Sequence, residues 1–333
     1  MHHRVPGILA FTAASLLTCA PAFAQLPDFY RSVASVHWVV ADLDKVKQGW
    51  ARLGFPALQD HGEVALPVKH RGQFASCRIR VAMGNLAGLE VQWIQPLDGN
   101  GAFAEFLARH GSGIMSLNHQ APSPEALDKE VARLKAVGIP VLQRADVDTG
   151  SGLLTVVHMD TEAEGKYVLG LVHGSVPGGA APPPVPFGLK RSQFAFLVKD
   201  LKSVGDFWKK AGFPEMPVTH GPLRDAVYRG QPGQFDQELG WHRHGEIVYE
   251  WIRILKGPTV YDEYLKAHGE GLHHLGFDVA DMDKVVAEWS ALGFPPLQSG
   301  AWGEKGKPGS GRFAYLDTEG IGGVLIELLW RQD

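Results

Sequence analysis

The sequence predicts an α+β fold built from four βαβββ units, which pair into two similar domains. Three observations predict it: the chain repeats itself at a fixed offset, each half contains two amphipathic helical segments, and the segments between them alternate between polar and apolar residues. The chain also contains 40 glycines and 22 prolines, which is typical of many short strands joined by turns. A helical bundle is therefore not expected.

The repeat has an offset of 158 residues. The matching positions are Asp42 with Asp200, Trp50 with Trp208, the sequence GFP at 54–56 with 212–214, and RGQ at 71–73 with 229–231. A constant offset between matching segments indicates duplicated structural units. The sequence therefore predicts a tandem duplication.

Four helical segments divide each half into two units. They have apolar residues at helical spacing and end in glycine, one apolar residue and proline. Glycine at this point is typical of a helix C-terminus, where the chain adopts a left-handed conformation. The predicted helices with their stop signals are 43–56, 127–140, 201–214 and 282–295.

The segments between these helices predict strands. Residues 247–255 and 323–330 alternate in the way expected of strands with one buried face. Each unit therefore reads as one strand, a helix and then about three strands.

The N-terminal 24 residues resemble a cleavable secretory signal. They begin with basic residues, continue with an apolar run at 8–20 and end in Ala22-Phe23-Ala24. This predicts a periplasmic or secreted protein with no membrane association after the signal is removed. Cleavage after Ala24 also removes Cys19 and leaves Cys77 as the one cysteine, which excludes an internal disulfide and a site made of several thiolates.

The predicted domains follow the repeat. The N-terminal domain spans 31–174, a linker rich in proline and glycine spans 175–189, and the C-terminal domain spans 190–331. A net charge of −4 gives no basic surface for nucleic acid, so the expected partner is a small-molecule substrate. The oligomeric state is left open.

The segment 269–279, GEGLHHLGFDV, resembles a strand that delivers a histidine ligand in methylmalonyl-CoA epimerases. Together with the four units it makes residues 31–331 similar to the vicinal oxygen chelate (VOC) superfamily, which includes lactoylglutathione lyases, extradiol dioxygenases and antibiotic resistance proteins. The resemblance implies that two units fold into a cup. It also implies that four inward side chains from four strands bind one divalent metal.

Carried over position by position, the resemblance implies the metal ligands Gln193, Glu250, His274 and Glu327. This order is similar to the ligand pattern of lactoylglutathione lyases and implies zinc, nickel, cobalt or manganese. Imidazole with oxygen donors suits such ions, and two carboxylates balance a double positive charge.

The N-terminal domain lacks most of these donors. The positions matching Gln193, Glu250, His274 and Glu327 hold Ser35, Gln92, Ser116 and Gly170. We therefore expect a degenerate metal site and a structural role for this domain. His37 lies two residues beyond Ser35 on the same strand face, which leaves open whether His37 and Gln92 form a residual second site.

The resemblance implies an isomerase or lyase that moves a proton beside a metal-polarised carbonyl, with Glu327 as the base and Glu250 as the other candidate for proton transfer. The expected substrate is a small hydroxy-carbonyl, keto-sugar or aromatic compound outside the cytoplasm. An iron-dependent extradiol dioxygenase is one alternative, although Gln193 stands where those enzymes carry histidine. A non-catalytic binding protein is the other.

Other residues receive simpler interpretations. His273 is expected to face away from the cup because neighbouring strand residues alternate. His242, Arg243 and His244 precede Gly245 and predict a solvated turn. The tryptophans Trp241, Trp251 and Trp302 are candidates either for an apolar pocket or for the core.

Overall fold

The computed structural model describes residues 26–175 and 185–332. The predicted signal at 1–24 and most of the predicted linker lie outside the described residues. No helix in the described ranges has the length and apolarity needed to cross a membrane.

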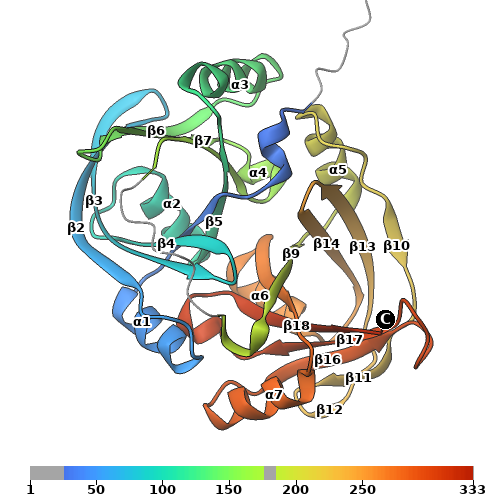
Figure 1. Cartoon of the computed structure of the whole chain (residues 1–333). Helices are drawn as coiled ribbons and strands as arrows, with labels where there is room; N and C mark the ends of the chain where they lie inside the picture. Colours follow the sequence, from blue (N-terminus) through green and yellow to red (C-terminus); the bar gives the residue numbers. More distant parts are fainter. Residues whose placement is uncertain (1–25, 176–184, 333) are drawn as a thin grey trace, which may run out of the picture.

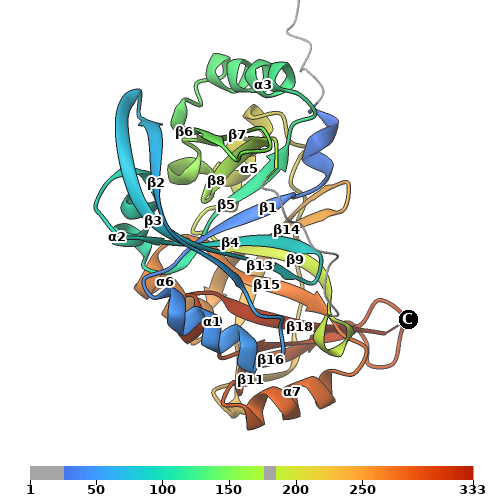
Figure 2. The same cartoon turned by 60° about the vertical axis from the view of Figure 1, so that its left-hand side comes forward.

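The first half of the chain forms a closed barrel (Figure 1). Its strands are β1 (Ser35–Val39), β2 (Gln59–His70), β3 (Gln73–Leu86), β4 (Leu89–Pro96), β5 (Gly113–Gln120), β6 (Val141–Asp148), β7 (Leu153–Met159) and β8 (Val168–His173). The helices are η1 (Asp28–Arg31), α1 (Leu43–Arg52), α2 (Gly101–His110), α3 (Pro124–Ala136) and α4 (Glu162–Gly165). The strand order is β1-β4-β3-β2-β6-β7-β8-β5. Figure 2 shows the long β2–β3 hairpin curving around this barrel.

The second half forms a curled sheet of ten strands. They are β9 (Lys190–Leu197), β10 (Val218–His220), β11 (Arg224–Tyr228), β12 (Gln231–Pro232), β13 (Asp236–His244), β14 (Ile247–Lys256), β15 (Gly271–Asp278), β16 (Pro296–Trp302), β17 (Gly311–Leu316) and β18 (Leu325–Arg331). The helices are η2 (Pro186–Gly188), α5 (Leu201–Lys210), α6 (Val260–His268), α7 (Met282–Ala291) and η3 (Glu319–Ile321). The order is β10-β13-β14-β9-β15-β18-β17-β16-β11-β12.

The second sheet stays open because the strand segment after α5 is divided. In the first half, β2 is continuous and closes the barrel by pairing with both β3 and β6. In the second half, β10 pairs with β13 whereas β11 pairs with β16. Pro222 lies between β10 and β11 and has no backbone N–H to donate to a strand ladder. The break at 221–223 therefore leaves an opening in the wall of the second sheet.

The four predicted helices are confirmed as α1, α3, α5 and α7. Asp42 and Asp200 cap the N-termini of α1 and α5 through their side chains. Gly54 and Gly212 follow the C-termini with φ angles of 85° and 98°, a region that favours glycine. The prediction for α3 was too short, because this helix already begins at Pro124 behind the capping residue Ser123.

Two helices were not predicted, α2 and α6, which join the two units of each half. The signal was present as aromatic residues three positions apart, Phe103 and Phe106 in α2 and Tyr261 and Tyr264 in α6, all of them buried. Apart from these connectors, the structure confirms four βαβββ units. In the third unit the second strand is divided into β10 and β11, and the third strand into β12 and β13.

One hydrophobic core extends across both halves. Trp38 in β1 donates a hydrogen bond from Nε1 to the carbonyl of Gly322 at 2.6 Å. Trp208 in α5 donates from Nε1 to the carbonyl of Gly165 at 3.1 Å and stacks on Tyr167 with 4.6 Å between ring centroids. Each half therefore places a buried indole against the other, and the two sheets are packed together rather than merely linked.

The contact between α2 and α6 is reciprocal. His110 donates from Nδ1 to the carbonyl of His268 at 2.7 Å, and His268 donates from Nδ1 to the carbonyl of His110 at 2.6 Å. The remaining ring nitrogens face carboxylates, with His110 Nε2 2.9 Å from Glu162 and His268 Nε2 2.8 Å from Glu319. These carboxylates raise the pKa of both histidines.

We expect the interface to weaken as the pH rises. A histidine whose pKa is raised by folding stabilises the folded state fully below about pH 6.5, its unfolded pKa, and this stabilisation is lost as the pH rises through the higher folded pKa. Thermal unfolding of wild type and of a His110→Gln, His268→Gln double variant measures the effect. The difference in melting temperature should be largest near pH 6 and shrink toward pH 9. A difference that is constant or grows with pH would contradict this assignment.

Candidate metal centre

The four predicted ligands lie on four adjacent strands. Gln193 is on β9, Glu250 on β14, His274 on β15 and Glu327 on β18, in the sheet order β14-β9-β15-β18. Gly276 in β15 pairs with both Gln193 and Glu327 across the two neighbouring ladders. Because side chains alternate along a strand, this register turns all four toward one side of the sheet.

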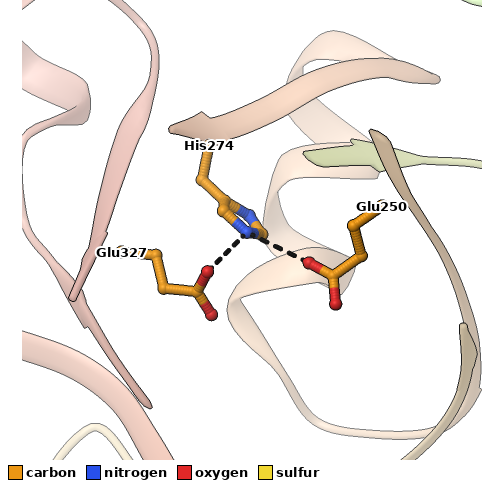
Figure 3. Close-up of side chains that lie close together, drawn as sticks. All are labelled: Glu250, His274 and Glu327. Atoms are coloured by element: carbon orange, nitrogen blue, oxygen red, sulfur yellow. Dashed lines mark ion pairs between the residues drawn. The ribbon is translucent and has the colours of Figure 1, made fainter. Parts of the chain in front are cut away.

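Their polar atoms converge on one point. Gln193 Nε2 donates to Glu250 Oε2 at 2.7 Å and to Glu327 Oε2 at 3.0 Å. His274 Nε2 lies 3.2 Å from Glu327 Oε2 and 3.5 Å from Glu250 Oε2, with a carboxylate on either side of the imidazole (Figure 3). All four side chains are buried, and His274 is fully enclosed.

The electrostatics of this cluster call for a cation. Burial raises the pKa of Glu250, and the Glu327 charge beside it raises it further. Burial alone lowers the pKa of His274, but the charge of Glu327 and contacts with both carboxylates raise it to about 9. One imidazole can balance at most one of the two enclosed carboxylates, so a divalent ion suits the cluster better than a proton does.

The donor atoms also fit a metal ion. Despite the short distance to Glu327, His274 Nε2 has no hydrogen bond of acceptable geometry to any described residue. It and one oxygen from each carboxylate lie within 4.8 Å of one another. Half a turn of the Gln193 amide exchanges Nε2 for Oε1 and supplies an oxygen donor at the same place. Imidazole with oxygen donors is a suitable set for zinc, nickel, cobalt or manganese.

His273 was predicted to face away from the cup, but its side chain contacts His274 of the cluster. It is fully buried, and its Nδ1 lies 2.8 Å from Nδ1 of His274. The ladder between β9 and β15 is irregular between Leu272 and His274, which breaks the simple alternation on which the prediction relied. His273 therefore contacts the ring nitrogen of His274 that points away from the carboxylates and holds the orientation of the imidazole.

The cluster opens into a cavity of about 490 Å³. Gln193, Glu250 and Glu327 line it, and residues 219–224 line it at the break between β10 and β11. Trp241 and Trp302 also line this cavity, whereas Trp251 is buried in the core and stacks on Phe196. A larger cavity of about 600 Å³, bordered by α7, β16 and β17, has no metal-binding cluster among the described residues.

The predicted solvated turn at 242–244 was wrong for His242. This residue lies within β13, is 1% exposed and accepts a hydrogen bond at Nδ1 from Trp251 Nε1 at 3.2 Å. The turn comes later, between the end of β13 at His244 and the start of β14 at Ile247. Arg243 is exposed and lines the cavity beside Trp241, so alternation along β13 separates the two neighbours.

In the N-terminal barrel, the Asn118 side chain fills the space between Ser35, Ser116 and Gly170. Asn118 pairs with Ser35 on one neighbouring strand and with Gly170 on the other. In the second half, Gly276 pairs in the same way with Gln193 and Glu327, so Asn118 and Gly276 occupy equivalent positions. Asn118 donates to Ser35 at 3.2 Å and accepts from Ser116 at 2.9 Å. A Cβ at Gly170 would lie 1.8 Å from Asn118 Oδ1. Ser35, Ser116 and Asn118 thus form a filled polar core, whereas Gln92 lines a separate cavity. The 158-residue offset does not predict this core, because Asn118 matches Gly276.

The comparisons with known proteins agree with this architecture. A family model described as Glyoxalase/Bleomycin resistance protein/Dioxygenase superfamily matches residues 35–155 and 192–315. The chain belongs to this superfamily. The predicted resemblance is thereby confirmed, and with it the fold of two VOC domains. Members of the superfamily use a divalent metal, and the buried cluster of Glu250, His274 and Glu327 has the donors to bind one.

Solved structures with low sequence identity share the fold of the superfamily. A triple mutant of 4-hydroxymandelate synthase from Streptomyces coelicolor has a TM-score of 0.59 and 17% identity, over 90% of this chain and 92% of that chain. A fusion of a xylose isomerase-like TIM barrel with 4-hydroxyphenylpyruvate dioxygenase has a TM-score of 0.52 and 13% identity, over 91% of this chain and 49% of the fusion. No curated protein matches in sequence.

Proposed function

We propose that this protein is a divalent-metal-dependent isomerase or lyase of the glyoxalase type, which moves a proton at the carbon next to a carbonyl group. The observation that carries the proposal is the convergence of Gln193, Glu250, His274 and Glu327 beside a cavity. These four residues would hold the ion. When bound, zinc, nickel, cobalt or manganese polarises a substrate carbonyl and stabilises the charge that forms on its oxygen.

The two carboxylates have different proposed roles in the proton transfer. Glu327 is the proposed base, whose carboxylate oxygen takes the proton from the substrate carbon, and Glu250 is the second acid-base group on the opposite side of His274. Both face the cavity. Their burial limits the access of water, which protects an enolate from protonation by solvent.

The substrate is proposed to be a small extracytoplasmic hydroxy-carbonyl, keto-sugar or aromatic compound with an anionic group. A cavity of about 490 Å³ suits a molecule of this size. Arg243 lies over the Trp241 ring at 5.3 Å and forms no ion pair within the described parts of the chain. The other arginines of the cavity, Arg224 and Arg331, are already paired with Asp225 and Asp278. Arg243 is thus the cation left to receive an anion.

Arg243→Gln is expected to raise KM for a carboxylate-bearing substrate about tenfold, as for the loss of one charged hydrogen bond. The kcat should stay close to that of wild type, because Arg243 forms no hydrogen bond or ion pair with Glu250 or Glu327 in the described parts of the chain. Steady-state kinetics with the carboxylate substrate and its methyl ester measure this. An equal loss for acid and ester would contradict a charge-specific role.

The iron-dependent ring-cleaving dioxygenase remains the alternative, and a non-catalytic binding protein is the third possibility. Iron oxygenases typically use two histidines and one carboxylate with open positions, whereas this cluster has one histidine, two carboxylates and one amide. The donor set therefore favours proton transfer. Fold similarity to dioxygenases does not decide the chemistry, because one fold supports several reactions.

The test of the proposed function follows the proton directly. Protein expressed from residue 25 and loaded separately with zinc, nickel, cobalt or manganese is incubated in D₂O with small 2-hydroxy-carbonyl compounds and keto-sugars. NMR should show deuterium entering the carbon next to the carbonyl, faster than with Glu327→Gln. Oxygen consumption by the iron-loaded protein with catechols would move the assignment to a dioxygenase. If the protein binds metal but catalyses neither reaction, the result would favour a non-catalytic binding protein.

A further inference from the structure

The interior of the N-terminal barrel contains its own cavity, of about 280 Å³. It is separate from the metal centre, because its lining residues come from β1 to β4, β6, β7, the turn after β6 and α2. Most of the lining is aliphatic. The aliphatic residues are Val64, Leu66, Ile79, Val81, Ile94, Ala145, Val147, Leu154 and Val156.

A small polar group interrupts this apolar lining. His37 and His158 are 3% and 1% exposed, and His37 Nδ1 lies 2.8 Å from His158 Nε2. The other nitrogen of His158, Nδ1, is buried without a hydrogen-bond partner among the described residues. Gln92, from the neighbouring strand, also lines the cavity. A buried polar atom without a partner costs free energy.

The two imidazoles are neutral in this environment. Burial lowers the pKa of His37 to about 4 and lowers that of His158 well below its usual value. No aspartate, glutamate, lysine or arginine is among the described residues that line the cavity. The site therefore offers no charge to an ionic ligand, and it lacks the carboxylates that accompany histidine in the C-terminal metal centre.

A hydrogen-bonded pair of neutral imidazoles can adapt to its ligand. Of His37 Nδ1 and His158 Nε2, one donates and the other accepts, and exchanging these roles changes the proton state of the free nitrogens. The pair can thus present either a donor or an acceptor. Phe103 contacts both rings edge to face, with centroid distances of 5.7 and 5.6 Å, and holds the pair in place.

We propose that this cavity, the His-pair cavity, is a second binding site for a small neutral aromatic molecule with one hydroxyl or carbonyl group. The ring would fill the aliphatic part, and the oxygen would hydrogen-bond to the pair. Dry cavities of about 150 Å³ lined by Leu, Ile and Phe already bind benzene, so 280 Å³ accommodates a substituted ring. The proposal does not rest on the proposed reaction, because it uses none of the metal-centre residues.

The second half shows why this site belongs to the first half alone. In the barrel, His158 pairs with Gly170, the position that matches Glu327. In the second half, Tyr315 pairs with Glu327, so a tyrosine occupies the position equivalent to His158. Tyr315 is hydrogen-bonded to Tyr261 at 2.6 Å. Gln143 also lines the cavity, but its Oε1 already accepts a hydrogen bond from the backbone N–H of Ala102 in α2 at 2.9 Å and is therefore less available to a ligand. The position of His158 therefore differs between the halves, because its Nδ1 has no partner among the described residues whereas the Tyr315 hydroxyl has one.

The test uses p-cresol and toluene as probes, which differ by one hydroxyl group. Calorimetry with the protein from residue 25 onward should show one site for p-cresol and at least tenfold weaker binding of toluene. Val156→Phe, which fills the His-pair cavity, should abolish binding of p-cresol. His158→Phe should remove the preference for p-cresol while toluene still binds. Leu239→Phe, in the C-terminal cavity, is the matched control and should change neither affinity.

Three results would overturn the proposal. They are no p-cresol binding at millimolar concentration, equal affinity for the two probes in wild type, and binding that is sensitive to Leu239→Phe but not to Val156→Phe. Because a filled barrel could unfold, the metal content and melting temperature of each variant are measured beside its affinity. Should Val156→Phe be unfolded, the change of preference in His158→Phe decides the matter.

Discussion

Glu327→Gln is expected to lower the rate of proton exchange next to the substrate carbonyl by about 10²- to 10⁴-fold, the usual contribution of a general base. The amide keeps an oxygen that can bind the metal but cannot take a proton at neutral pH. Metal binding should therefore be weakened far less than turnover. Deuterium incorporation and metal content, measured on the same samples, separate the two effects.

Glu250→Gln is the matched control, because Glu250 lies at the same cluster, on the other side of His274. A larger loss in Glu250→Gln than in Glu327→Gln would exchange the proposed roles. Normal metal binding with full turnover in Glu327→Gln would show that this carboxylate is not the base, whatever the metal does.

Gly276→Ala is expected to weaken metal binding about 10- to 100-fold, as changes beside metal ligands commonly do. Gly276 lies between two ligands, and an added Cβ would come 2.6 Å from Gln193 Cγ and 3.1 Å from Glu327 Oε2. Neither ligand can move far, because both are buried in the same cluster. Titration with a fluorescent metal chelator as competitor gives the affinity.

Gly320→Ala serves as the control for adding a methyl group, since no atom lies within 4 Å of its Cβ position. It should bind metal like wild type. If Gly276→Ala keeps the wild-type affinity and a similar melting temperature, the metal lies elsewhere than between Gln193 and Glu327.

Much of the fold could be predicted because the duplication repeats local signals. Each signal predicts a different feature: the 158-residue offset predicts the duplication, the glycines after Arg52 and Lys210 predict the helix ends, and the alternation along β14 and β18 predicts strands. The four ligand positions followed from a family resemblance rather than from spacing, since their sequence separations are set only by the fold. The structure brings all four together, and their role as metal ligands stays a prediction.

What could not be predicted depends on contacts between distant strands. The opening of the second sheet comes from a break around Pro222, a position that reads as an ordinary turn in sequence. The filling of the N-terminal site by Asn118 needs the ladder register to be seen. The orientation of His273 was predicted wrongly because the ladder between β9 and β15 is irregular beside it. His242 was wrongly placed in a turn because β13 continues to His244.

The most direct test of the metal centre is elemental analysis of protein purified without chelator and without a histidine tag. Wild type is compared with His274→Ala and with Ser116→Ala, its equivalent in the N-terminal barrel. We expect about one equivalent of zinc, nickel, cobalt or manganese in wild type and Ser116→Ala, and almost none in His274→Ala, because imidazole is a principal donor for these ions. Absence of metal from wild type under every loading condition, or unchanged metal in His274→Ala, would contradict a metal centre at this site.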